Sequence, residues 1–342
     1  MSKLPEQDKL VELIDAHHAG KSDFRPHLGA SIIGHSCDRW LWLSFRFSVR
    51  ENFSGRIKRL FRRGQNEEAT VVSDLRDADM TVTECLNMQK FHWLAPHIGC
   101  TPDGLLVGHP DAPKAKHSLE IKTHSLKSFT ALQKDGVEKS KPMHFAQMQC
   151  EMVAQKTDRA LYYAVCKDND EIYTERVKLD KDVANQIIER GKRIVFSNRM
   201  PEPIAGGSAS WYECKYCPGH DICWGSKLTK EVNCRTCTFS TAMEDGAWTC
   251  ARFDRVEIPF ENQTQGCECH VLHLDLVPFQ LDAEKSTETT AVWIINGKPV
   301  ANGEADANVY GSSEIVANAA ACAKHDDFTT AMREEMGARV IG

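Results

Sequence analysis

The chain has 342 residues, of which 42% are hydrophobic and 26% are charged, and its formal net charge is −6. This composition is typical of a soluble globular protein and excludes a simple polycation, so contacts with nucleic acid would need a local basic patch. No run approaches the roughly 18 apolar residues that cross a bilayer, and the N-terminus lacks a signal-peptide core. The sequence therefore predicts a cytoplasmic protein without a membrane partner.

Helical and strand-like patterns alternate through residues 1–200. Helices are expected over 5–16, over 32–47 with Ser31 as the cap, and over 54–77, 125–135, 142–156 and 180–198. Strands are expected over 81–91, 103–108, 118–123, 160–168 and 171–179, with a turn at Asn169. This order predicts an α/β (α+β) fold with a mixed sheet flanked by helices.

The chain changes character after residue 200. Residues 201–210 are rich in Pro, Gly and Ser and are typical of a linker. Two cysteine clusters follow, and then a hairpin pattern over 290–303 and an Ala-rich helical tail. The second half of the chain is therefore expected to hold separate, smaller modules.

Three charged residues indicate a catalytic metal site. Asp103 lies in a Pro-Asp-Gly turn before an apolar strand, and Glu120 and Lys122 alternate along the next strand. Because side chains two residues apart on a strand share a face, Glu120 and Lys122 point to the same side. Two neighbouring carboxylates can hold Mg²⁺, which activates water and neutralises charge on a phosphate, and a lysine suits the phosphate or the hydroxide. The alternative is a solvated strand edge.

Two helices carry polar side chains on apolar faces. Glu68 falls within the stripe of the helix over 54–77, whereas Glu67 lies toward its flank. The stripe consists of Ile57, Leu60, Phe61, Gly64, Val71, Val72 and Leu75. A carboxylate there is costly unless it is paired or binds metal. Gln147, between apolar positions of the helix over 142–156, needs a partner from a nucleotide or the metal-site strand. The alternatives are an exposed glutamate and a partly exposed glutamine.

The order of these motifs resembles that of the PD-(D/E)XK exonucleases of the lambda-exonuclease and YqaJ type, and of the nuclease domain of the RecB family. The motifs are Gly64-x3-Glu68, Pro102-Asp103-Gly104, Glu120-Ile121-Lys122 and HFAQMQ over 144–149, and the likeness covers about residues 30–200. It implies a restriction-endonuclease-like core that hydrolyses DNA from an end with two Mg²⁺ or Mn²⁺ ions.

The same resemblance implies roles for single residues. Glu68, Asp103, Glu120 and the backbone carbonyl of Ile121 would ligate the metal ions. Lys122 would orient or activate the nucleophilic water, and Gln147 would match the glutamine of the helix that follows the catalytic strand. One position departs from the RecB-type pattern, because Glu151 stands where that pattern has a tyrosine.

The resemblance also implies a setting in phage or prophage recombination and repair, in the host cytoplasm, with a single-strand annealing or recombination protein as a partner. A structure-specific or restriction-type endonuclease of the same fold is the nearest alternative. A non-catalytic, metal-stabilised DNA-binding protein is an alternative from another class, and the intact Asp103, Glu120 and Lys122 argue against it.

Basic and aromatic residues are interleaved between residues 39 and 63. Only Glu51 opposes the eight cations Arg39, Arg46, Arg50, Arg56, Lys58, Arg59, Arg62 and Arg63. Such a segment predicts a salt-sensitive surface that contacts DNA phosphates, with some aromatic rings able to stack on unpaired bases. The alternative is a solvated basic helix.

Fourteen cysteines are many for a reducing compartment, where clustered thiols indicate metal binding. Five stand alone and are predicted to be small buried residues: Cys85, Cys100, Cys150, Cys166 and Cys322. The pattern Cys214-x2-Cys217-x5-Cys223 supplies three soft ligands, and Cys37, far upstream, is the candidate for the fourth. Four thiolates can hold a [4Fe–4S] cluster or zinc, and the spacing does not choose between them.

This first cluster resembles that of the iron–sulfur nucleases related to RecB, which include the CRISPR-associated four-cysteine nuclease and the AddB subunit. In those proteins one cysteine precedes the nuclease core and three follow it. The resemblance implies a [4Fe–4S] cluster held by Cys37, Cys214, Cys217 and Cys223 that closes the chain around the core. The alternative is an independent zinc knuckle in which His220 replaces Cys37.

The second cluster predicts a zinc-ribbon-like module held by Cys234, Cys237, Cys250 and Cys267, with Cys269 and His270 as spare candidates for the last ligand. A second iron–sulfur site is the alternative, and a structural role is favoured because the segment is poor in core residues. Four parts are expected: a nuclease core with N-terminal helices over 1–200, a cluster segment over 201–229 that closes on Cys37, the zinc module over 230–280 and a tail subdomain over 281–342.

Overall fold

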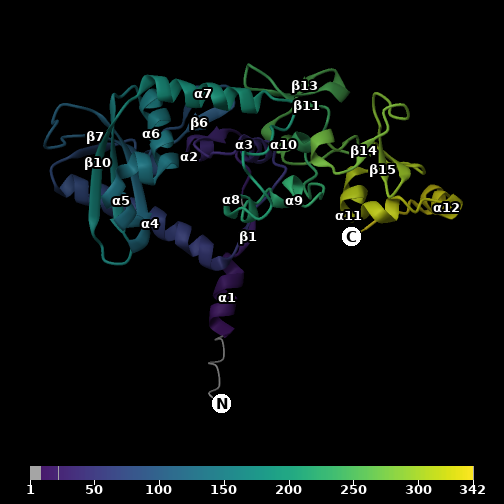
Figure 1. Ribbon diagram of the computed structural model, residues 1–342, viewed down its shortest axis with the longest axis horizontal. Helices are drawn as coiled ribbons and strands as arrows, with labels where there is room; N and C mark the ends of the chain where they lie inside the picture. Colours follow the sequence, from purple (N-terminus) through teal and green to yellow (C-terminus); the bar gives the residue numbers. More distant parts are fainter. Residues whose placement is uncertain (1–8, 22, 342) are drawn as a thin grey trace, which may run out of the picture. The chain divides into compact units, whose positions relative to one another are not determined.

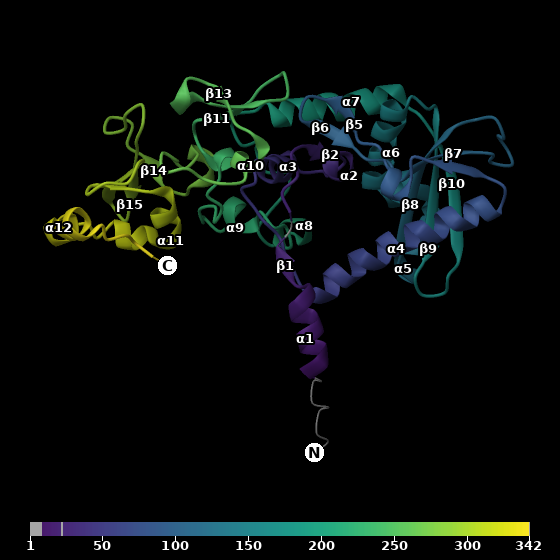
Figure 2. The ribbon, with the colours of Figure 1, turned by 180° about the vertical axis from the view of Figure 1, so that it is seen from behind.

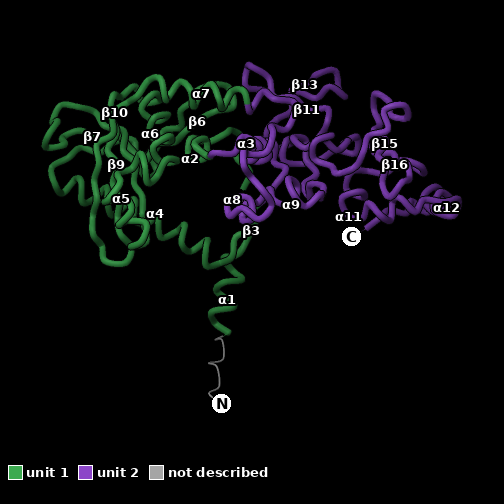
Figure 3. Tube along the Cα trace, viewed as in Figure 1, with its two compact units in different colours: residues 1–35, 51–193 green, residues 36–50, 194–342 purple. Residues whose placement is uncertain are grey.

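The computed structural model describes residues 9–21 and 23–341, so the start of the helix expected over 5–16 lies outside the described residues. The chain forms two compact units (Figure 3): residues 1–35 and 51–193 form unit 1, and residues 36–50 and 194–342 form unit 2. The short segment 36–50 thus belongs with the second half of the chain. The four-part division that the sequence suggested does not follow these units and stays a prediction.

Unit 1 is built on a five-stranded mixed sheet (Figure 1), as the alternation of patterns predicts. Its order is β10 (Ile172–Lys178), β9 (Arg159–Cys166), β8 (His117–His124), β7 (Gly104–Val107) and β4 (Thr81–Thr83). Only β8 and β9 are parallel, and the other neighbours are antiparallel. A parallel pair needs a crossover, which here consists of α5 (Leu126–Ser140) and α6 (Pro142–Gln155).

Helices cover both faces of this sheet. Val71, Val72 and Leu75 of α4 (Gly55–Asp77) pack on odd-numbered residues of β8 and β9, such as Leu119 and Ile121. The opposite face packs on α5 and α6, whose buried residues there are Phe129, Leu132, Val137, Met148 and Met152. The period of two along β8 therefore leaves Glu120 and Lys122 on the face away from Leu119.

Small elements complete unit 1. The strands β2 (Leu28–Gly29), β6 (Ile98–Cys100) and β5 (His92–Ala95) form one sheet, and β1 (Gly20–Lys21) pairs with β3 (Asn52–Phe53). The end of α1 (Lys9–His18) meets the start of α4, as both ribbon views show (Figures 1 and 2). In α7 (Lys181–Val195), Arg190 donates to the carbonyl oxygens of Ile33 and His35 at 3.2 and 2.6 Å.

Several sequence predictions need correction. The single helix expected over 32–47 is two helices, α2 (Ala30–Ile33) and α3 (Asp38–Phe45). Ser31 lies inside α2 and caps nothing, whereas Cys37 caps α3 by accepting from the Trp40 amide at 3.4 Å. The break follows Gly34, where an added Cβ would lie 2.7 Å from the Cβ of Ala146, so α6 packs too closely for a larger residue.

Two further differences concern strand 81–91 and the stripe of α4. The strand ends at Thr83, because Glu84 and Leu86 have φ of 53° and 56° and leave the extended region. In α4 the apolar stripe is buried only in its second half, and Leu60 and Phe61 are exposed. Phe61 packs edge-on against Phe53 instead, with ring centroids 5.0 Å apart.

Unit 2 has two small sheets and short helices. One sheet contains β11 (Ser240–Ala242), β12 (Trp248–Cys250) and β13 (Val256–Glu257). The other contains β14 (Gln280–Leu281), β15 (Ala291–Ile295), β16 (Lys298–Asn302) and β17 (Val309–Tyr310). The expected hairpin is confirmed as β15 and β16, joined by Asn296 and Gly297, both with positive φ as a type I′ turn requires.

The helices of unit 2 are α3, α8 (Tyr212–Lys215), α9 (His220–Cys223), α10 (Phe260–Gln263), α11 (Ser312–Cys322) and α12 (Asp327–Met336), with the short 3₁₀ turn η2 (Cys234–Thr236). A buried ion pair between Arg333 and Glu314, 2.6 Å long, joins α12 to α11. No helix within the described ranges is long and apolar enough to span a bilayer.

Candidate active site and thiol pockets

Strand β8 brings a carboxylate and a lysine together in unit 1. Glu120 is fully buried, and its Oε1 pairs with Nζ of Lys122, whose side chain is 28% exposed. Asp103 immediately precedes β7, and its Oδ2 accepts from the backbone N–H of Ile121 at 2.8 Å. This bond fixes the Asp103 carboxyl beside the strand that carries Glu120 and Lys122.

Helix α6 adds an amide and a second buried carboxyl. Nε2 of Gln147 donates to Oε2 of Glu120 at 3.0 Å and to Oε1 of Glu151 at 2.8 Å. Glu151 lies one turn further along the helix and is as fully buried as Glu120. The partner that Gln147 was expected to need is thus Glu120 on β8. The catalytic role of Gln147 stays a prediction.

Glu68 reaches the same group from α4. It is half-buried, and burial together with the charge of Asp103 raises its pKa to about 7, against an opposing effect of Lys122. Its neighbour Glu67 acts instead on Tyr163, whose pKa it helps to raise after burial and Asp74. The two glutamates therefore face different surroundings, as the helical spacing predicts.

The site carries more negative than positive groups. Burial raises the pKa of Asp103, of Glu120 and of Glu151; the charge of Asp103 adds to the shift of Glu120, and the charges of Glu120 and Asp103 add to that of Glu151. For Lys122 burial acts downward, but Glu120 and Asp103 outweigh it and hold its pKa above the usual value. A divalent cation would relieve this repulsion, and the donors are the oxygens that Mg²⁺ and Mn²⁺ prefer.

Sequence analysis assigned roles to Glu68, Asp103, Glu120, Lys122 and Gln147. It gave no role to Glu151 and did not identify a neighbouring triad. The hydroxyl of Tyr162 lies 2.9 Å from Nε2 of His124 and 2.8 Å from Nδ1 of His144. Burial lowers the pKa of His124 to about 4 and of His144 to about 3, and nearby lysine charges act in the same direction. The spacing of the residues could have indicated this triad. His124 lies on the same face of β8 as Glu120 and Lys122, and His144 lies three residues before Gln147 on α6.

The first thiol pocket lies in unit 2. Cys37, Cys214, Cys217 and Cys223 line it, together with Arg39, Trp40, Pro203, Ile204, His220 and Trp224. Burial, together with the charges of the other three cysteines, raises the pKa of Cys217 to about 11. The Gly219 amide donates to Cys217, and Arg39 to Cys223, so both sulfurs meet donors that favour thiolates.

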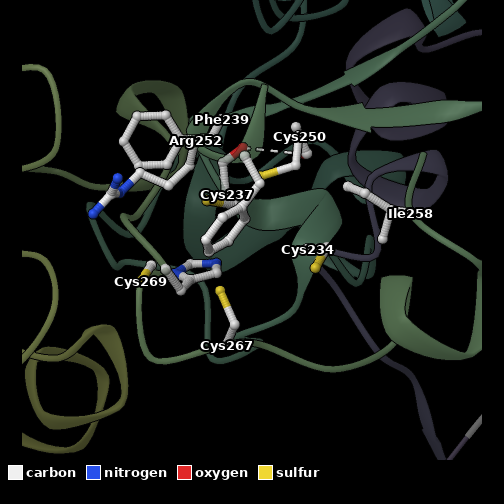
Figure 4. Close-up of a pocket in the computed structure, with 11 residues that line it drawn as sticks. Cys234, Cys237, Phe239, Cys250, Arg252, Ile258, Cys267 and Cys269 are labelled. Carbon is white, nitrogen blue, oxygen red and sulfur yellow. Dashed lines mark hydrogen bonds between the residues drawn. The ribbon is translucent and has the colours of Figure 1, made fainter. Parts of the chain in front are cut away.

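The second thiol pocket, also in unit 2, contains Cys234, Cys237, Cys250, Cys267, Cys269 and His270 among its lining residues. Figure 4 shows the sulfurs of Cys234, Cys237, Cys250 and Cys267 around one space, with Cys269 to one side. Within the part of the chain that the structure describes, no group of three or more His, Cys, Asp or Glu side chains is arranged so that it could hold a metal ion, so both thiol sites stay predictions. The five cysteines predicted to be isolated are all buried, which confirms that prediction.

The basic segment 39–63 is divided between the units. Arg46 is buried with 2% exposure, so it does not belong to a phosphate-contacting surface, and Arg39 donates to the carbonyl of Pro201 at 2.7 Å. Within the part of this segment that lies on α4, the exposed cations are Arg56, Arg62 and Arg63. The prediction of one continuous basic surface over 39–63 is therefore wrong. A high density of arginines along the sequence does not show which guanidinium groups are buried and which are exposed.

No family model and no curated protein matches the chain. Among solved structures, the alkaline exonuclease LHK-Exo from Laribacter hongkongensis is 16% identical, with TM-scores of 0.36 alone and 0.35 in complex with dAMP, covering 54% of this chain and 90% of its own. The structure of SSO0001 is 13% identical with a TM-score of 0.36, covering 63% of this chain and 93% of its own. TM-scores below 0.5 do not establish a common fold, so the function must be derived from the residues of the site.

Proposed function

We propose that the chain is a metal-dependent deoxyribonuclease that hydrolyses phosphodiester bonds at DNA ends. One observation carries the proposal: Glu68 of α4, Asp103 just before β7, and Glu120 and Lys122 of β8 form one group. Beyond the effect of burial, Asp103 and Lys122 both shift the pKa of Glu68 and of Glu120, and Lys122 shifts that of Asp103. A solvated strand edge would not bury Glu120 completely or tie Asp103 to the Ile121 amide. A site that concentrates carboxyls around one lysine is suited to a divalent cation and a phosphate.

Each residue has a role that its contacts support. Glu68, Asp103, Glu120 and the carbonyl of Ile121 would hold two Mg²⁺ or Mn²⁺ ions, which, when bound, supply an activated water and neutralise the scissile phosphate. Gln147 holds Oε2 of Glu120 at 3.0 Å and so fixes the direction of that carboxyl. Lys122, partly exposed beside Glu120, orients the water or a phosphate oxygen.

The finer parts of the proposal rest on the motif order. The resemblance to the lambda-type exonucleases supports action at DNA ends, a role in phage recombination and repair, and a single-strand annealing protein as partner. The exposed Arg56, Arg62 and Arg63, on the helix that carries Glu68, supply positive charge for a phosphate backbone.

Two cofactors in unit 2 belong to the same proposal. We assign Cys37, Cys214, Cys217 and Cys223 as one ligand set, because Cys37 lines the pocket with the other three and Nε2 of His220 contacts the carbonyl of Ala209 at 3.2 Å. The resemblance to the iron–sulfur nucleases supports a [4Fe–4S] cluster in this set. We assign zinc to Cys234, Cys237, Cys250 and Cys267. Both ligand sets lie within unit 2 and include none of the proposed catalytic residues, so we assign both sites a structural role.

End-labelled linear DNA and closed circular DNA, incubated with Mg²⁺, Mn²⁺ or EDTA, test the enzyme. Linear DNA should be degraded only with metal, and Glu120→Gln should reduce the rate at least about a hundredfold. The matched control is Glu189→Gln, at an exposed position of α7. Cleavage of the circle would establish an endonuclease instead. DNA binding without metal-dependent turnover in the wild type would establish the non-catalytic alternative.

A further inference from the structure

A second polar group continues along the two elements that carry buried carboxyls in unit 1. On β8, His124 lies on the face of Glu120 and Lys122, two residues beyond the lysine. On α6, which packs against β8, His144 lies one turn before Gln147. The two imidazole rings are neighbours, with centroids 5.9 Å apart. The strand and the helix thus present carboxyls at one end of their shared face and two histidines at the other.

One tyrosine hydroxyl joins the two histidines. Tyr162 of β9 is buried, and its oxygen lies 2.9 Å from Nε2 of His124 and 2.8 Å from Nδ1 of His144. Nδ1 of His124 lies 3.1 Å from the hydroxyl of Ser128. A hydroxyl has one proton, so Tyr162 donates to one ring and accepts from the other. The four side chains therefore form one chain of hydrogen bonds that runs from Ser128 to His144.

This chain of hydrogen bonds ends on an accessible nitrogen. Nε2 of His144 has no hydrogen-bond partner among residues 9–21 and 23–341, and it is not enclosed, since the His144 side chain is only half-buried. Both ring nitrogens of His124, in contrast, are bonded. Because His124 alone would satisfy the buried hydroxyl of Tyr162, the outward nitrogen of His144 is the part of the group that the fold does not use.

The protonation of the two rings fits an outward donor. Burial and nearby lysine charges lower the pKa of His124 to about 4 and that of His144 to about 3, so both rings are neutral near pH 7 and each has one N–H. If the protons run from Ser128 through His124 and Tyr162 to Nδ1 of His144, the remaining proton of His144 stands on Nε2. The reverse direction leaves an acceptor there, so an anion outside selects the first direction.

The surroundings of this nitrogen are positively charged. Lys122 lies two residues before His124 on β8, and the Lys167 amide donates to the carbonyl of His124 at 2.8 Å. Lys141 directly precedes α6 and lies one turn before His144. The lysine charges that act on the two rings are those of Lys122, Lys141 and Lys167. An N–H donor among lysines suits a negatively charged oxygen.

We infer that Nε2 of His144 donates a hydrogen bond to a phosphate of the DNA strand beside the one that is cleaved, with the hydrogen-bonded chain from Ser128 holding its ring in the donor tautomer. This inference rests on the proposed function, since it concerns the substrate of the same site. Two residues of a strand span roughly 7 Å, so a phosphate at the histidines is distinct from the one at Lys122 and the carboxyls. Such a contact positions the strand and takes no part in the bond cleavage.

Two substitutions of His144 separate its outward nitrogen from its inward one. In His144→Gln the amide takes the place of Nε2, and in His144→Asn it takes the place of Nδ1, which contacts Tyr162. On linear duplex DNA with Mg²⁺, KM should rise about tenfold or more in His144→Asn and less than about threefold in His144→Gln, with kcat little changed in both. A histidine that only satisfies the Tyr162 hydroxyl would give the opposite order, and that order overturns the inference.

The matched control is His109→Asn, in the turn after β7. Nδ1 of His109 accepts from the Asp111 amide at 3.2 Å, a contact that asparagine can keep. Its ring lies 5.4 Å from that of His117, at the opposite end of β8 from His124. KM should therefore equal that of the wild type. Thermal unfolding of every variant is measured alongside, and a lower unfolding temperature of His144→Asn with wild-type KM assigns His144 a structural role only.

Neutral phosphates in the substrate locate the contact. Duplexes that carry a single methylphosphonate at successive positions of the cleaved strand remove one negative charge at a time. In the wild type KM should rise about tenfold at one position beside the cleaved bond. In His144→Asn the same methylphosphonate should add less than about threefold, because its partner is already gone. Effects of the two changes that multiply in full at every position overturn the inference.

Two further comparisons separate the sources of phosphate and the two proposals. Duplexes with and without terminal phosphates distinguish an end phosphate from a backbone phosphate, and a His144 effect confined to DNA with terminal phosphates overturns the assignment to the strand. A wild type that leaves unmodified linear DNA intact with Mg²⁺ overturns the proposed function and the inference with it. Degradation of that DNA together with a flat methylphosphonate series overturns the inference alone.

Discussion

The two units hold their candidate metal ligands in different ways. In unit 1 three carboxyls stand on long regular elements, α4, β8 and α6, and the fourth, Asp103, is held beside β8 by its bond to the Ile121 amide, so backbone hydrogen bonds and apolar faces fix the side chains before any ion binds. In unit 2 the thiols stand on turns and on helices of four residues, such as α8 and α9. Ligands on a rigid scaffold can be removed without loss of the fold, whereas ligands on short elements provide part of the folding energy themselves.

The largest effect is expected in unit 1, on turnover alone. Asp103→Asn should lower nuclease activity at least about a hundredfold, because it removes a charged ligand. Since an asparagine oxygen can still accept from the Ile121 amide, the free energy of unfolding should change by less than about 1 kcal/mol. Activity on linear DNA and a denaturant titration measure the two quantities. Wild-type turnover would reject the site, and a collapsed fold would break the contrast between the units.

The next effect concerns unit 2 and should appear in stability and colour. Anaerobically purified wild type should be brown, with iron and sulfide, and Cys37→Ser should be colourless. Serine is itself a good helix cap, so α3 can still begin there. A loss of roughly 2–3 kcal/mol in unfolding free energy is therefore expected from the cluster and not from the cap. Cys166→Ala, a buried cysteine of unit 1, is the control and should stay brown. Zinc without iron in the wild type would contradict the cluster.

A smaller effect distinguishes two adjacent glutamates on α4. Glu68→Gln should reduce turnover about tenfold or more, since its carboxyl interacts with Asp103 and Lys122. Glu67→Gln should change it less than about twofold, because Glu67 faces Tyr163. Rates at saturating DNA in Mg²⁺ measure both. Equal losses would mean that α4 does not contribute a ligand.

The smallest effect is a pH dependence of stability in metal-free protein. The folded pKa of Glu68, about 7, lies above the ordinary 4.5, so the folded state holds more protons between these values. Stability is then greater at low pH and falls as the pH rises from 4.5 to 7, by well under about 1.4 kcal/mol per pH unit because the group is half-exposed. Glu68→Gln should flatten this slope, and Mg²⁺ should offset it. If stability depends on pH equally in Glu68→Gln and in the wild type, a carboxyl other than Glu68 has the raised pKa.

Sequence patterns predicted those site residues that share one regular element. The period of two placed Glu120 and Lys122 on one face of β8, and helical spacing separated Glu68 from Glu67. Glu151 was noticed only as a departure from a pattern. Glu151 belongs to the site because Gln147 hydrogen-bonds both Glu151 and Glu120. The bond to Glu120 joins α6 to β8, and the periodicity of a single helix or strand cannot predict it.

Predictions failed where tertiary contacts override local pattern. The run over 32–47 has continuous helical character, yet it breaks beside α6 at Gly34, and its second half joins unit 2. Arg46 looked like part of a DNA-binding patch because its neighbours in sequence are basic. Its neighbours in space are Trp42 of its own helix and three residues far along the chain, Asn198, Arg235 and Trp248.

The membership of segment 36–50 in unit 2 also bears on how the chain is made. Leu41, Trp42, Leu43 and Phe45 of α3 are buried, and their contacts include residues beyond 193: the carbonyl of Ser197 accepts from the Trp42 indole at 2.9 Å, and the Phe45 ring packs on Trp248. During translation this apolar helix leaves the ribosome before the whole of 51–193 has been synthesised. At about 5–20 residues per second the delay is on the order of ten seconds. A nascent chain thus exposes α3 for that interval, and a truncation near residue 200 would leave it uncovered for good.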